Sequence, residues 1–503
     1  MTFLRSALLA ALPLNALAQL GPTAAPYPDS TYQNATEEYT TEDALTNATS
    51  PPKYPSPWGE GLGDWDRAYA QARDFVSQLT LLEKVNLTTG VGWQGEKCVG
   101  NVGAIPRLGF RALCLQDSPL GVRNADYVSA FPAGVTIAST WDRELFYQRG
   151  YDMGSEHRDK GVDIQLGPVV GPIGRAPEGG RNWEINNSYA CQNSYVQNYL
   201  LKNELGFQGF ILSDWQAQHS GVASALAGLD MTMPGDVVFN SADSFWGTNL
   251  TIAVLNGTVP QWRLDDMTTR IVAGWYYVDR ASNEAENAPN FSSWTDDTYG
   301  FEHYYAQEDY TQINWHYDVR QDHAADIRNQ AAKGTVLLKN TGALPLTGKE
   351  QLTAVFGSDA GENPWGPNGC ADRGCDNGTL AMGWGSGTAE FPYLVTPLEA
   401  IKAKVRSNGK SIEGITDDYA YSQINSLANS AAQVDGACIV FANADAGEGY
   451  IIVDGNEGDR NNLTLWHNGN DLISNVSSYC PNTIVVMHTV GPVLVDSFYE
   501  NPN

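Results

Sequence analysis

The most informative stretch of the chain is Gly206-Phe207-Gln208-Gly209-Phe210-Ile211-Leu212-Ser213-Asp214-Trp215. Its apolar centre, Phe210 to Leu212, predicts a short buried strand that ends abruptly in Ser213-Asp214. Downstream, residues 222–227 predict a helix and residues 229–235 predict the next strand with its loop. That alternation indicates an α/β fold, and an acid at the carboxyl end of a strand is where a (β/α) barrel places its chemistry. The local pattern fits equally well with Asp214 capping the following helix.

The bulk composition is that of a large globular protein with a strong negative charge. At 503 residues the chain is long enough for two or more domains. Hydrophobic residues make up 42% and charged residues 17%, which excludes an intrinsically disordered chain. The formal net charge of −28 disfavours binding to nucleic acid or to an acidic membrane surface through general electrostatics. Neutral partners, carbohydrates among them, fit this charge better.

The amino terminus is typical of a secreted protein. Arg5 supplies a positive charge, residues 7–14 supply an apolar core, and Ala16-Leu17-Ala18 is a small-residue cleavage pattern. We therefore expect a signal peptide over 1–18 and no membrane anchor in it, because the core is too short to span a bilayer. Asn-x-Ser/Thr sequons agree with an extracellular glycoprotein. They are Asn34, Asn47, Asn86, Asn186, Asn249, Asn256, Asn290, Asn377, Asn462 and Asn475.

The seven cysteines are an odd number for an oxidising compartment. Two pairs have spacings that allow a disulfide to close a local loop. Three cysteines remain, so at least one thiol lacks a partner. The pairs are Cys98 with Cys114 and Cys370 with Cys375, and the others are Cys191, Cys438 and Cys480.

Composition divides the chain into a leader and two domains. Residues 19–60 are rich in Pro, Ser, Thr, Tyr and acids, and they predict a flexible leader. Strand-like and helical runs alternate over 61–280, a polar and aromatic segment over 281–324 predicts a linker, and a second α/β domain covers 325–503. The elements that we expect are helices over 66–81, through Glu156-His157, and over 327–332, 398–405 and 421–433, with strands over 162–168, 335–340, 352–356, 437–442 and 483–488.

Five separate motifs together resemble one protein family. They are Leu115 to Arg123 (L-Q-D-S-P-L-G-V-R), Gly180 to Glu184 (G-R-N-W-E), Ser213 to Trp215 (S-D-W), Ala446 to Tyr450 (A-G-E-G-Y) and Asp454 to Arg460 (D-G-N-E-G-D-R). From about residue 55 to its last residue the chain resembles the fungal secreted β-glucosidases of glycoside hydrolase family 3. The resemblance implies an α/β protein in which a TIM-like (β/α) barrel over 61–280 is followed by an α/β sandwich over 325–503.

The activity that this resemblance implies is the retaining exo-hydrolysis of terminal non-reducing β-D-glucosyl residues. The substrates would be cellobiose, cello-oligosaccharides and aryl β-glucosides, which places the enzyme in cellulose degradation. We expect no cofactor and no metal, because the sequence has no His/Cys ligand cluster and no P-loop. The sequence leaves the preferred linkage and the oligomeric state open.

The resemblance assigns the two catalytic carboxyl groups. Asp214 in the barrel is the implied nucleophile, and Glu448 in the second domain is the implied general acid/base. A retaining glycosidase needs such a pair about 5–5.5 Å apart, because one group attacks the anomeric carbon while the other protonates the leaving oxygen. Glu457 is a rival acid in the same loop region, but Gly447-Glu448-Gly449-Tyr450 is the closer match.

The resemblance also predicts the residues that bind the sugar. Asp117 would accept hydrogen bonds from two hydroxyls of the terminal glucose, and arginines would donate to ring hydroxyls. A tryptophan next to the nucleophile offers a flat apolar face. The alternatives are a structural Asp–Arg ion pair and a core tryptophan. The predicted substrate-binding residues are Asp117, Arg123, Arg181, Trp215, Ser386, Trp93, Phe245 and Tyr450.

Two departures from the family pattern bear on activity. After Glu184 the family continues through further barrel units that carry a Lys-His pair, whereas here Ile185 to Tyr189 resembles a segment well downstream. We therefore expect an internal deletion near 184/185 and an incomplete barrel, in which Cys191 has lost its family partner. The chain also ends before the remaining strands of the sandwich, so we expect a truncated second domain.

These departures predict a weakly active or inactive polypeptide, because much of the binding that orients the sugar is missing. Two other functions stay open. One is a β-xylosidase or other exo-glycosidase of the same family, and the other is an inactive carbohydrate-binding fragment.

Overall fold

The structure is a computed structural model that describes residues 51–169, 177–179, 189–282, 288–375 and 377–503. It divides into two compact units, unit 1 (Met1–Gln116, Arg158–Ile164, Trp183–His316) and unit 2 (Asp117–His157, Gln165–Asn182, Tyr317–Asn503). Several predictions lie outside the described residues. They are the signal peptide, the leader up to residue 50, the junction at 184/185, and the residues Arg181, Asn34, Asn47 and Asn186.

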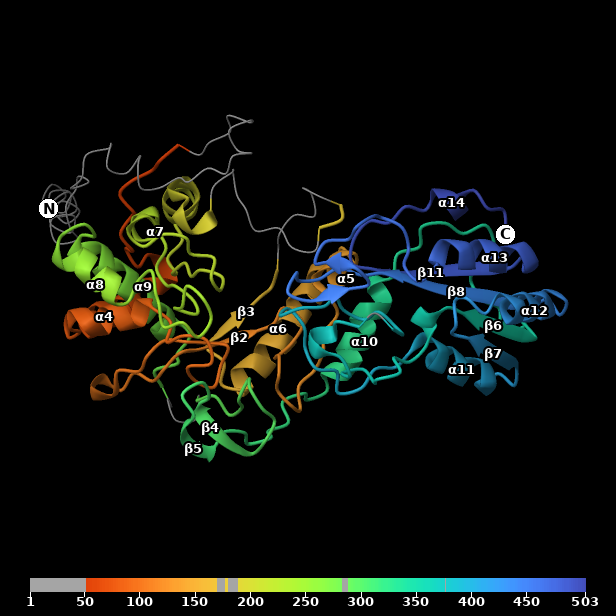
Figure 1. Ribbon diagram of the computed structural model, residues 1–503, viewed down its shortest axis with the longest axis horizontal. Coiled ribbons are helices and arrows are strands. Elements are labelled where there is room, and N and C mark those ends of the chain that lie inside the picture. The colour runs from red at the N-terminus through yellow and green to blue at the C-terminus, as the bar shows by residue number, and fades with distance from the viewer. Residues whose placement is uncertain (1–50, 170–176, 180–188, 283–287, 376) are drawn as a thin grey trace, which may run out of the picture. The chain divides into compact units, whose positions relative to one another are not determined.

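Unit 1 contains helices, short strands and a hairpin (Figure 1). Its elements are α3 (Asp66–Ser77), α4 (Leu81–Thr88), β1 (Gly100–Asn101), β2 (Cys114–Asp117), β3 (Ile164–Leu166), a π-helix (Tyr195–Glu204), α7 (Val222–Ala227), α8 (Thr248–Leu255), α9 (Gln261–Tyr277), β4 (Tyr299–His303) and β5 (Glu308–Gln312); β2 and β3 continue into unit 2. The single helix that we predicted over 66–81 is wrong. A capping box between Thr80 and Glu83 starts a new helix at Leu81.

The predicted strands at Phe210 to Leu212 and over 229–235 do not form as full strands, and Phe210 to Leu212 is half-buried, but both segments make isolated parallel bridges. Leu212 bridges Met231 and Thr89 bridges Thr232, both in parallel. Backbone hydrogen bonds join Ser213 N to Met231 O (3.0 Å) and Thr232 N to Thr88 O (2.9 Å). Three extended segments therefore lie side by side and parallel. Within the described residues they remain isolated bridges and not full strands, so the architecture shown is mixed α/β.

A fully buried ion network supports these segments. Asp230 accepts from Lys202 and Arg263 at 2.9 Å each, and its other carboxylate oxygen accepts from Ile211 N at 2.9 Å. Asp266 accepts from Arg263 (2.9 Å) and Arg270 (3.1 Å), and all five charged side chains are at most 1% exposed. Paired charges of this kind stay buried only when their remaining hydrogen bonds are satisfied.

The end of the predicted leader belongs to this network. Arg270 donates to the carbonyl of Pro57 at 2.9 Å, and the backbone N–H of Gly59 donates to Asp266 at 2.7 Å. The prediction of a flexible leader up to residue 60 is therefore wrong for its last residues. The carbonyl of Pro57 supplies Arg270 with an acceptor beyond the two carboxylates, and Gly59 N–H supplies Asp266 with a further donor.

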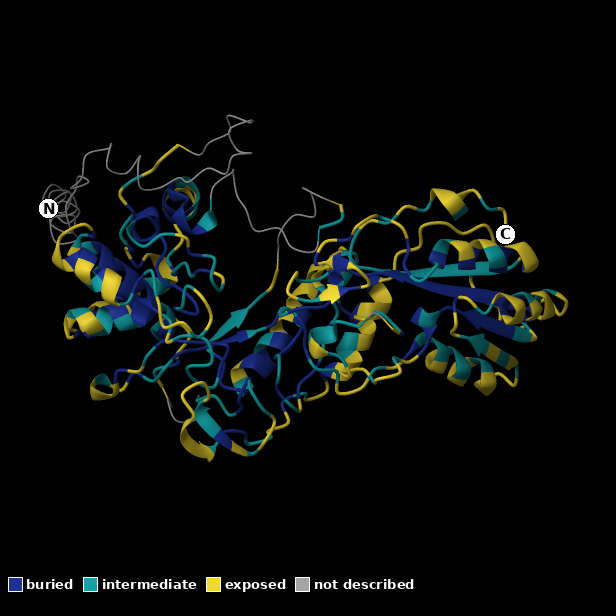
Figure 2. Ribbon diagram, viewed as in Figure 1, coloured by how far each residue is buried: buried dark blue, intermediate teal, exposed yellow. Residues whose placement is uncertain are grey.

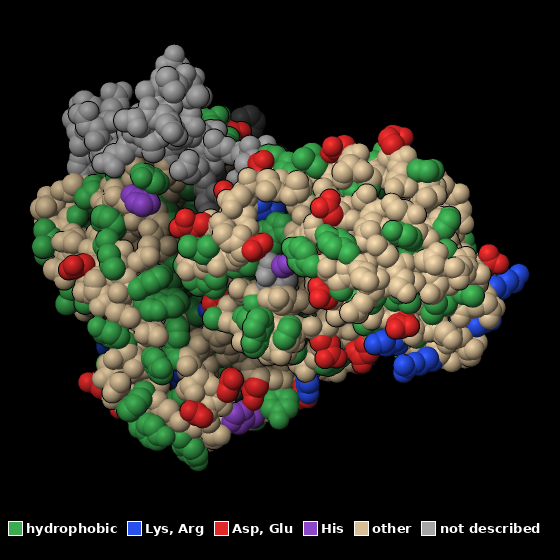
Figure 3. Space-filling view, turned by 45° about the vertical axis from the view of Figure 1, so that its right-hand side comes forward, with side chains coloured by type: hydrophobic (Ala, Val, Ile, Leu, Met, Phe, Trp, Pro, Cys, Tyr) green, Lys and Arg blue, Asp and Glu red, His purple; other side chains and the backbone are tan. Residues whose placement is uncertain are grey.

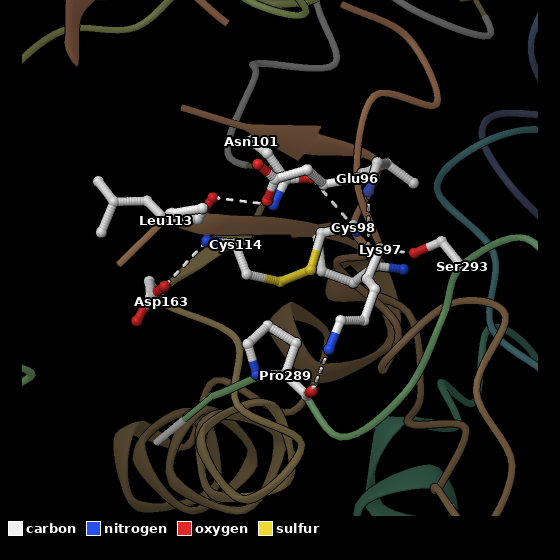
Figure 4. The surroundings of a disulfide bond; sticks show 12 residues. Glu96, Lys97, Cys98, Asn101, Leu113, Cys114, Asp163, Pro289 and Ser293 are labelled. Carbon is white, nitrogen blue, oxygen red and sulfur yellow. Dashed lines mark hydrogen bonds between the residues drawn. A yellow bond between two sulfur atoms is a disulfide. The ribbon is translucent and has the colours of Figure 1, made fainter. Parts of the chain in front are cut away.

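The Cys98–Cys114 disulfide ties β2 to the loop before β1 (Figure 4). Around it, Asn101 donates to Leu113 O (3.0 Å) and Cys114 N donates to Asp163 (2.8 Å). The predicted linker over 281–324 also contains regular structure, because β4 and β5 form an antiparallel hairpin within it.

Unit 2 is built around a four-stranded parallel sheet in the order β11-β8-β6-β7 (Figure 1). Its elements are α5 (Gly134–Ala138), α6 (Arg143–Asp159), α10 (His323–Gly334), β6 (Leu352–Phe356), α11 (Pro397–Ser407), β7 (Ser411–Ile415), α12 (Tyr421–Ala432), β8 (Ala437–Ala444), β9 (Ile452–Val453), β10 (Asn456–Glu457), α13 (Gly469–Tyr479), β11 (Thr483–Thr489) and α14 (Asp496–Tyr499), of which α6 ends in unit 1.

Helices cover both faces of this sheet. Ile424 of α12 and Leu472 of α13 pack with alternate strand residues on one face. Leu398 and Ile401 of α11 pack on the other face with Ile439. Figure 2 shows the result: β8 is buried along its whole length, whereas β11 at the edge is half-buried. A parallel sheet needs such cover on both faces, so its strands read as continuous apolar runs.

One predicted strand of unit 2 is wrong. Residues 335–340 form no strand, and Val336, Leu337 and Leu338 are 57%, 64% and 68% exposed. No described segment pairs with this run. Its β-branched and apolar composition therefore has no backbone partner to stabilise it as a strand.

The disulfides and sequons can now be sorted. Cys98–Cys114 and Cys370–Cys375 form as predicted, a third bridge joins Cys438 to Cys480, and Cys191 is free and buried. Asn290 donates its amide to Asp159 O, and the amide nitrogen of Asn475 is buried. The remaining described sequons are half-buried at Asn86 and exposed at Asn249, Asn256, Asn377 and Asn462.

The surface reflects the net charge. Figure 3 shows carboxylates scattered over the face in view, with few Lys or Arg side chains among them. Among the described residues, no helix combines the length and apolar character needed to cross a membrane.

Candidate active site

Glu448 lies where an open α/β sheet usually binds its ligand. The chain passes from β6 outward to β7 and then returns to place β8 on the other side of β6. The carboxyl ends of β6 and β8 therefore flank a topological switch point, which is the ligand-binding crevice of such folds. β8 ends at Ala444, and Glu448 follows in the next loop. The prediction that Glu448 sits in a loop after this strand is confirmed.

A turn at Gly385-Ser386 fixes the side chain of Glu448. Ser386 donates to Oε2 of Glu448 from its backbone N (2.8 Å) and from Oγ (2.6 Å). The indole N–H of Trp384 donates to the carbonyl of Glu448 at 3.0 Å. Gly385 adopts φ 118°, and a Cβ there would lie 2.6 Å from the Cβ of Glu448. Only glycine allows this approach.

The rival acid lacks these features. Glu457 lies in β10, is exposed, and pairs with Ile452. Gly447 explains why the loop passes close to its support, because a Cβ at that position would lie 2.3 Å from the carbonyl oxygen of Trp384. The geometry of unit 2 therefore favours Glu448 over Glu457 as a functional carboxyl group.

Asp117 and Arg123 are adjacent, as the motif predicts. Arg123 N donates to Asp117 O at 2.9 Å, and its guanidinium lies 3.8 Å from the Asp117 carboxylate. A closer ion pair joins Arg123 Nη2 to Asp372 Oδ1 at 2.6 Å. Tyr450 donates to the other carboxylate oxygen of Asp372. The structural Asp–Arg ion pair, which was the alternative role for Arg123, is therefore formed chiefly with Asp372. The sequence motifs do not single out Asp372.

Asp214 lies in unit 1, exposed, at the end of a firmly held segment. Ser213 before it is buried, and its Oγ accepts from Met233 N at 2.8 Å. The alternative role of Asp214 as a helix cap is excluded, because the residue that caps α7 is Gly221. Trp215 is half-buried, and its indole N–H donates to Val99 O at 3.1 Å.

Trp93, one of the predicted substrate-binding residues, is part of an aromatic pair in unit 1. Trp93 stacks on Phe239 with ring centroids 4.6 Å apart, and Phe239 is 41% exposed. Phe245, another predicted substrate-binding residue, is half-buried and packs against the core cluster that contains Trp246 and Leu250. The sequence motifs do not single out Phe239, although it lies in the exposed run Val238-Phe239.

The free thiol of Cys191 also belongs to unit 1. Burial raises the pKa of this thiol to about 12, and the negative charge of Asp214 adds to the effect. A thiol with so high a pKa is inert as a nucleophile at neutral pH. Among the described residues, no three His, Cys, Asp or Glu side chains gather in a way that would hold a metal ion.

A glutamate held at the switch point of an open α/β sheet is the usual arrangement of a small-ligand site in this class of fold. Comparisons with known proteins identify the family of the chain. Residues 335–503 match the Glycosyl hydrolase family 3 C-terminal domain. The chain is 53% identical to beta-glucosidase 1 of Aspergillus aculeatus over 548 residues, covering 91% of this chain and 63% of the relative.

Solved structures of beta-glucosidases are also similar to this chain. The Chaetomium thermophilum beta-glucosidase is 52% identical with a TM-score of 0.85, covering 90% of this chain and 64% of that one. Beta-glucosidase D2-BGL of Chaetomella raphigera is 39% identical with a TM-score of 0.79, covering 88% and 69%. The chain therefore belongs to glycoside hydrolase family 3. It spans about 63% of the length of the Aspergillus relatives that it matches.

Proposed function

We propose that this protein is a β-glucosidase that removes terminal non-reducing β-D-glucosyl residues with retention, from cellobiose, cello-oligosaccharides and aryl β-glucosides. The observation that carries the proposal is the placement of Glu448 in a loop after β8, with Oε2 bound twice by Ser386. The names of the relatives, which are beta-glucosidases at 50–53% identity, support the same substrate class.

In this proposal Asp214 attacks the anomeric carbon while Glu448 protonates the departing oxygen. The glucosyl–Asp214 ester then forms as the glycosidic bond breaks, and Glu448 next removes a proton from the water that hydrolyses the ester. Both donors from Ser386 go to Oε2, so we assign the transferable proton to Oε1. Asp117, Arg123, Arg181 and Trp215 bind the glucose, and Trp93 and Tyr450 line the leaving-group side.

We propose a (β/α) barrel over 61–280 that is internally deleted near 184/185. The parallel bridges Leu212–Met231 and Thr89–Thr232 support it, because neighbouring barrel strands pair in parallel. The alignment with the Aspergillus aculeatus relative supports the deletion, because it extends over 548 residues and this chain has only 503. Gaps must therefore open in this chain.

We also propose that the protein is secreted. Three disulfides support an oxidising compartment, since cytosolic thiols stay reduced. The signal-peptide pattern over 1–18 is the second support.

The test is hydrolysis of two aryl β-D-glucosides by the purified chain at pH 5. One carries p-nitrophenol, and the other carries 2,4-dinitrophenol, which leaves without a proton. Asp214→Asn should abolish the release of both. Glu448→Gln should retain dinitrophenol release, and added azide should raise its turnover and yield β-glucosyl azide. Glu457→Gln is the matched control and should behave as the wild type.

The other outcomes decide between the alternatives. Faster turnover of p-nitrophenyl β-D-xyloside than of the glucoside would make the protein a β-xylosidase. A folded wild type with no turnover on any of these substrates would contradict the proposal for this chain. The observation that favours an inactive chain is the internal gap, because the alignment of 548 residues is longer than this chain of 503.

A further inference from the structure

A short loop of unit 2, closed by the Cys370–Cys375 disulfide, holds two residues in an unusual backbone conformation. Asp372 has φ 46° and Arg373 has φ 62°, both in the left-handed region. Each such residue costs about 1 kcal/mol or more unless the surroundings compensate, and such residues gather at ligand sites. Two side-chain contacts of Arg373 hold the loop in place. Arg373 forms an ion pair with Glu390 at 3.2 Å and also donates to Asn368.

The left-handed turn aims Asp372 at two predicted substrate-binding residues at once. Its Oδ1 accepts from Nη2 (2.6 Å) and Nε (3.2 Å) of Arg123, and its Oδ2 accepts from the phenol of Tyr450. Its carbonyl accepts from Gly385 N at 2.9 Å. Gly385 precedes Ser386, which binds Glu448. One residue thus connects the guanidinium, the phenol and the turn beneath the acid/base.

The electrostatics agree with this arrangement. Although burial opposes the charge on Arg123, the carboxylates of Asp372 and Asp117 raise the pKa of its guanidinium. Burial raises the pKa of the Tyr450 phenol, and the hydrogen bond to Asp372 raises it further. Both carboxylate oxygens of Asp372 are occupied by donors, so the residue is suited to hold its neighbours and not to transfer a proton.

We propose that Asp372 is a positioning residue of the sugar site. It orients the guanidinium of Arg123 toward the glucose and the ring of Tyr450 toward the leaving group, and the disulfide loop keeps it rigid. This inference rests on the proposed glucosidase function. In this proposal Asp372 affects substrate binding and not the chemical step. The reason is that Arg123 and Tyr450, the two residues that it holds, contact the substrate equally in the ground state and in the transition state.

The test variant is Asp372→Asn, because asparagine tolerates the left-handed conformation and has nearly the same shape. Its amide lacks the charge and has one acceptor oxygen for two donors. With p-nitrophenyl β-D-glucoside we expect KM to rise about tenfold and kcat to change less than threefold, the signature of lost uniform binding. Asp454→Asn, an exposed aspartate of unit 2 that also has positive φ, is the matched control and should leave both constants unchanged.

A second measurement does not depend on turnover. Phenolate absorbance in the wild type minus that in Tyr450→Phe isolates the titration of Tyr450. In Asp372→Asn this titration should move to lower pH, because the negative charge that opposes phenolate formation is gone. In a double-mutant cycle, the double variant should raise KM by less than the product of the factors by which Asp372→Asn and Tyr450→Phe each raise it.

The outcomes separate this inference from the proposed function. An inactive wild type contradicts the glucosidase function for this chain, and the Tyr450 titration then decides the role of Asp372. An unchanged titration, or KM effects that add fully, would overturn the positioning role. If Asp372→Asn fails to fold, Tyr450→Phe removes the same hydrogen bond from a side chain that is 57% exposed, and an unchanged KM there would overturn the Tyr450 half of the inference.

Discussion

Ser386 donates two hydrogen bonds to the same carboxyl oxygen of Glu448, one from its backbone N–H at 2.8 Å and one from its hydroxyl at 2.6 Å. The backbone donor cannot rotate away, and Gly385 before it brings the turn within contact of the glutamate. The orientation of the carboxyl group is therefore set by the backbone N–H and the hydroxyl of one residue, Ser386. A fixed carboxyl group of this kind is what a proton donor needs in order to reach one oxygen of the substrate.

These two hydrogen bonds predict the effect of replacing Ser386. In Ser386→Ala the hydroxyl bond is lost and the backbone bond remains, so kcat/KM for p-nitrophenyl β-D-glucoside should fall about fivefold, the effect of losing one hydrogen bond of about 1 kcal/mol. Ser386→Thr keeps the hydroxyl and should recover most of the rate. Equal rates for the alanine and threonine variants would show that the hydroxyl does not matter.

Two neighbouring aspartates of α9 should differ sharply in their effect on stability. Asp266 is buried and binds both Arg263 and Arg270, whereas Asp265 is 29% exposed and binds Lys84. Asp266→Asn leaves buried positive charge uncompensated, so we expect the free energy of unfolding to fall by about 3–5 kcal/mol. Asp265→Asn should cost at most about 1 kcal/mol. Urea unfolding checks both, and similar losses would contradict the assigned role of the network.

Glu96 should make stability depend on pH. Burial raises the pKa of this carboxyl group to about 7, although the positive charges of His303 and Lys97 oppose the shift. Between about pH 4.5 and pH 7 the folded protein thus holds a proton that the unfolded chain releases, so this group destabilises the fold increasingly as pH rises through that window.

The measurement is the melting temperature of Glu96→Gln against the wild type at pH 4, 6 and 8. The variant should match the wild type at pH 4 and exceed it at pH 8, by up to about 3 kcal/mol in the free energy of unfolding. Glu60→Gln, a change at an exposed glutamate of unit 1, serves as the control. A difference that does not change with pH would contradict this account.

Cys191 should react only after unfolding. Its thiol is buried and its pKa is raised to about 12 by burial, while the other six cysteines form disulfides. Iodoacetamide should leave the native protein unlabelled and add one group in urea without reductant, as counted by mass spectrometry. Cys191→Ala should take up none. Two or more adducts on the wild type would mean that a disulfide is open.

The elements that could be predicted from sequence are those with strong local signals. β6, β8, β11 and α12 were placed within about two residues, because buried parallel strands are continuous apolar runs and α12 has a helical apolar period. The run over 335–340 also has an apolar and β-branched centre and still forms no strand, because a strand requires a partner that local composition does not reveal. The break between α3 and α4 also has a local signal, because Thr80-x-x-Glu83 is the capping box that starts α4.

The family motifs, the two short-range disulfides and the loop that carries Glu448 all involve residues close together in the chain, so the local sequence indicates them. The contact between Asp372 and Arg123, which are 249 positions apart, and the stacking of Trp93 on Phe239 arise only in the folded chain. Folding also makes the carbonyl of Pro57, at the end of the predicted leader, an acceptor for Arg270. Contacts between distant residues depend on how the sheet and the buried charges bring the chain together, and no local pattern records that.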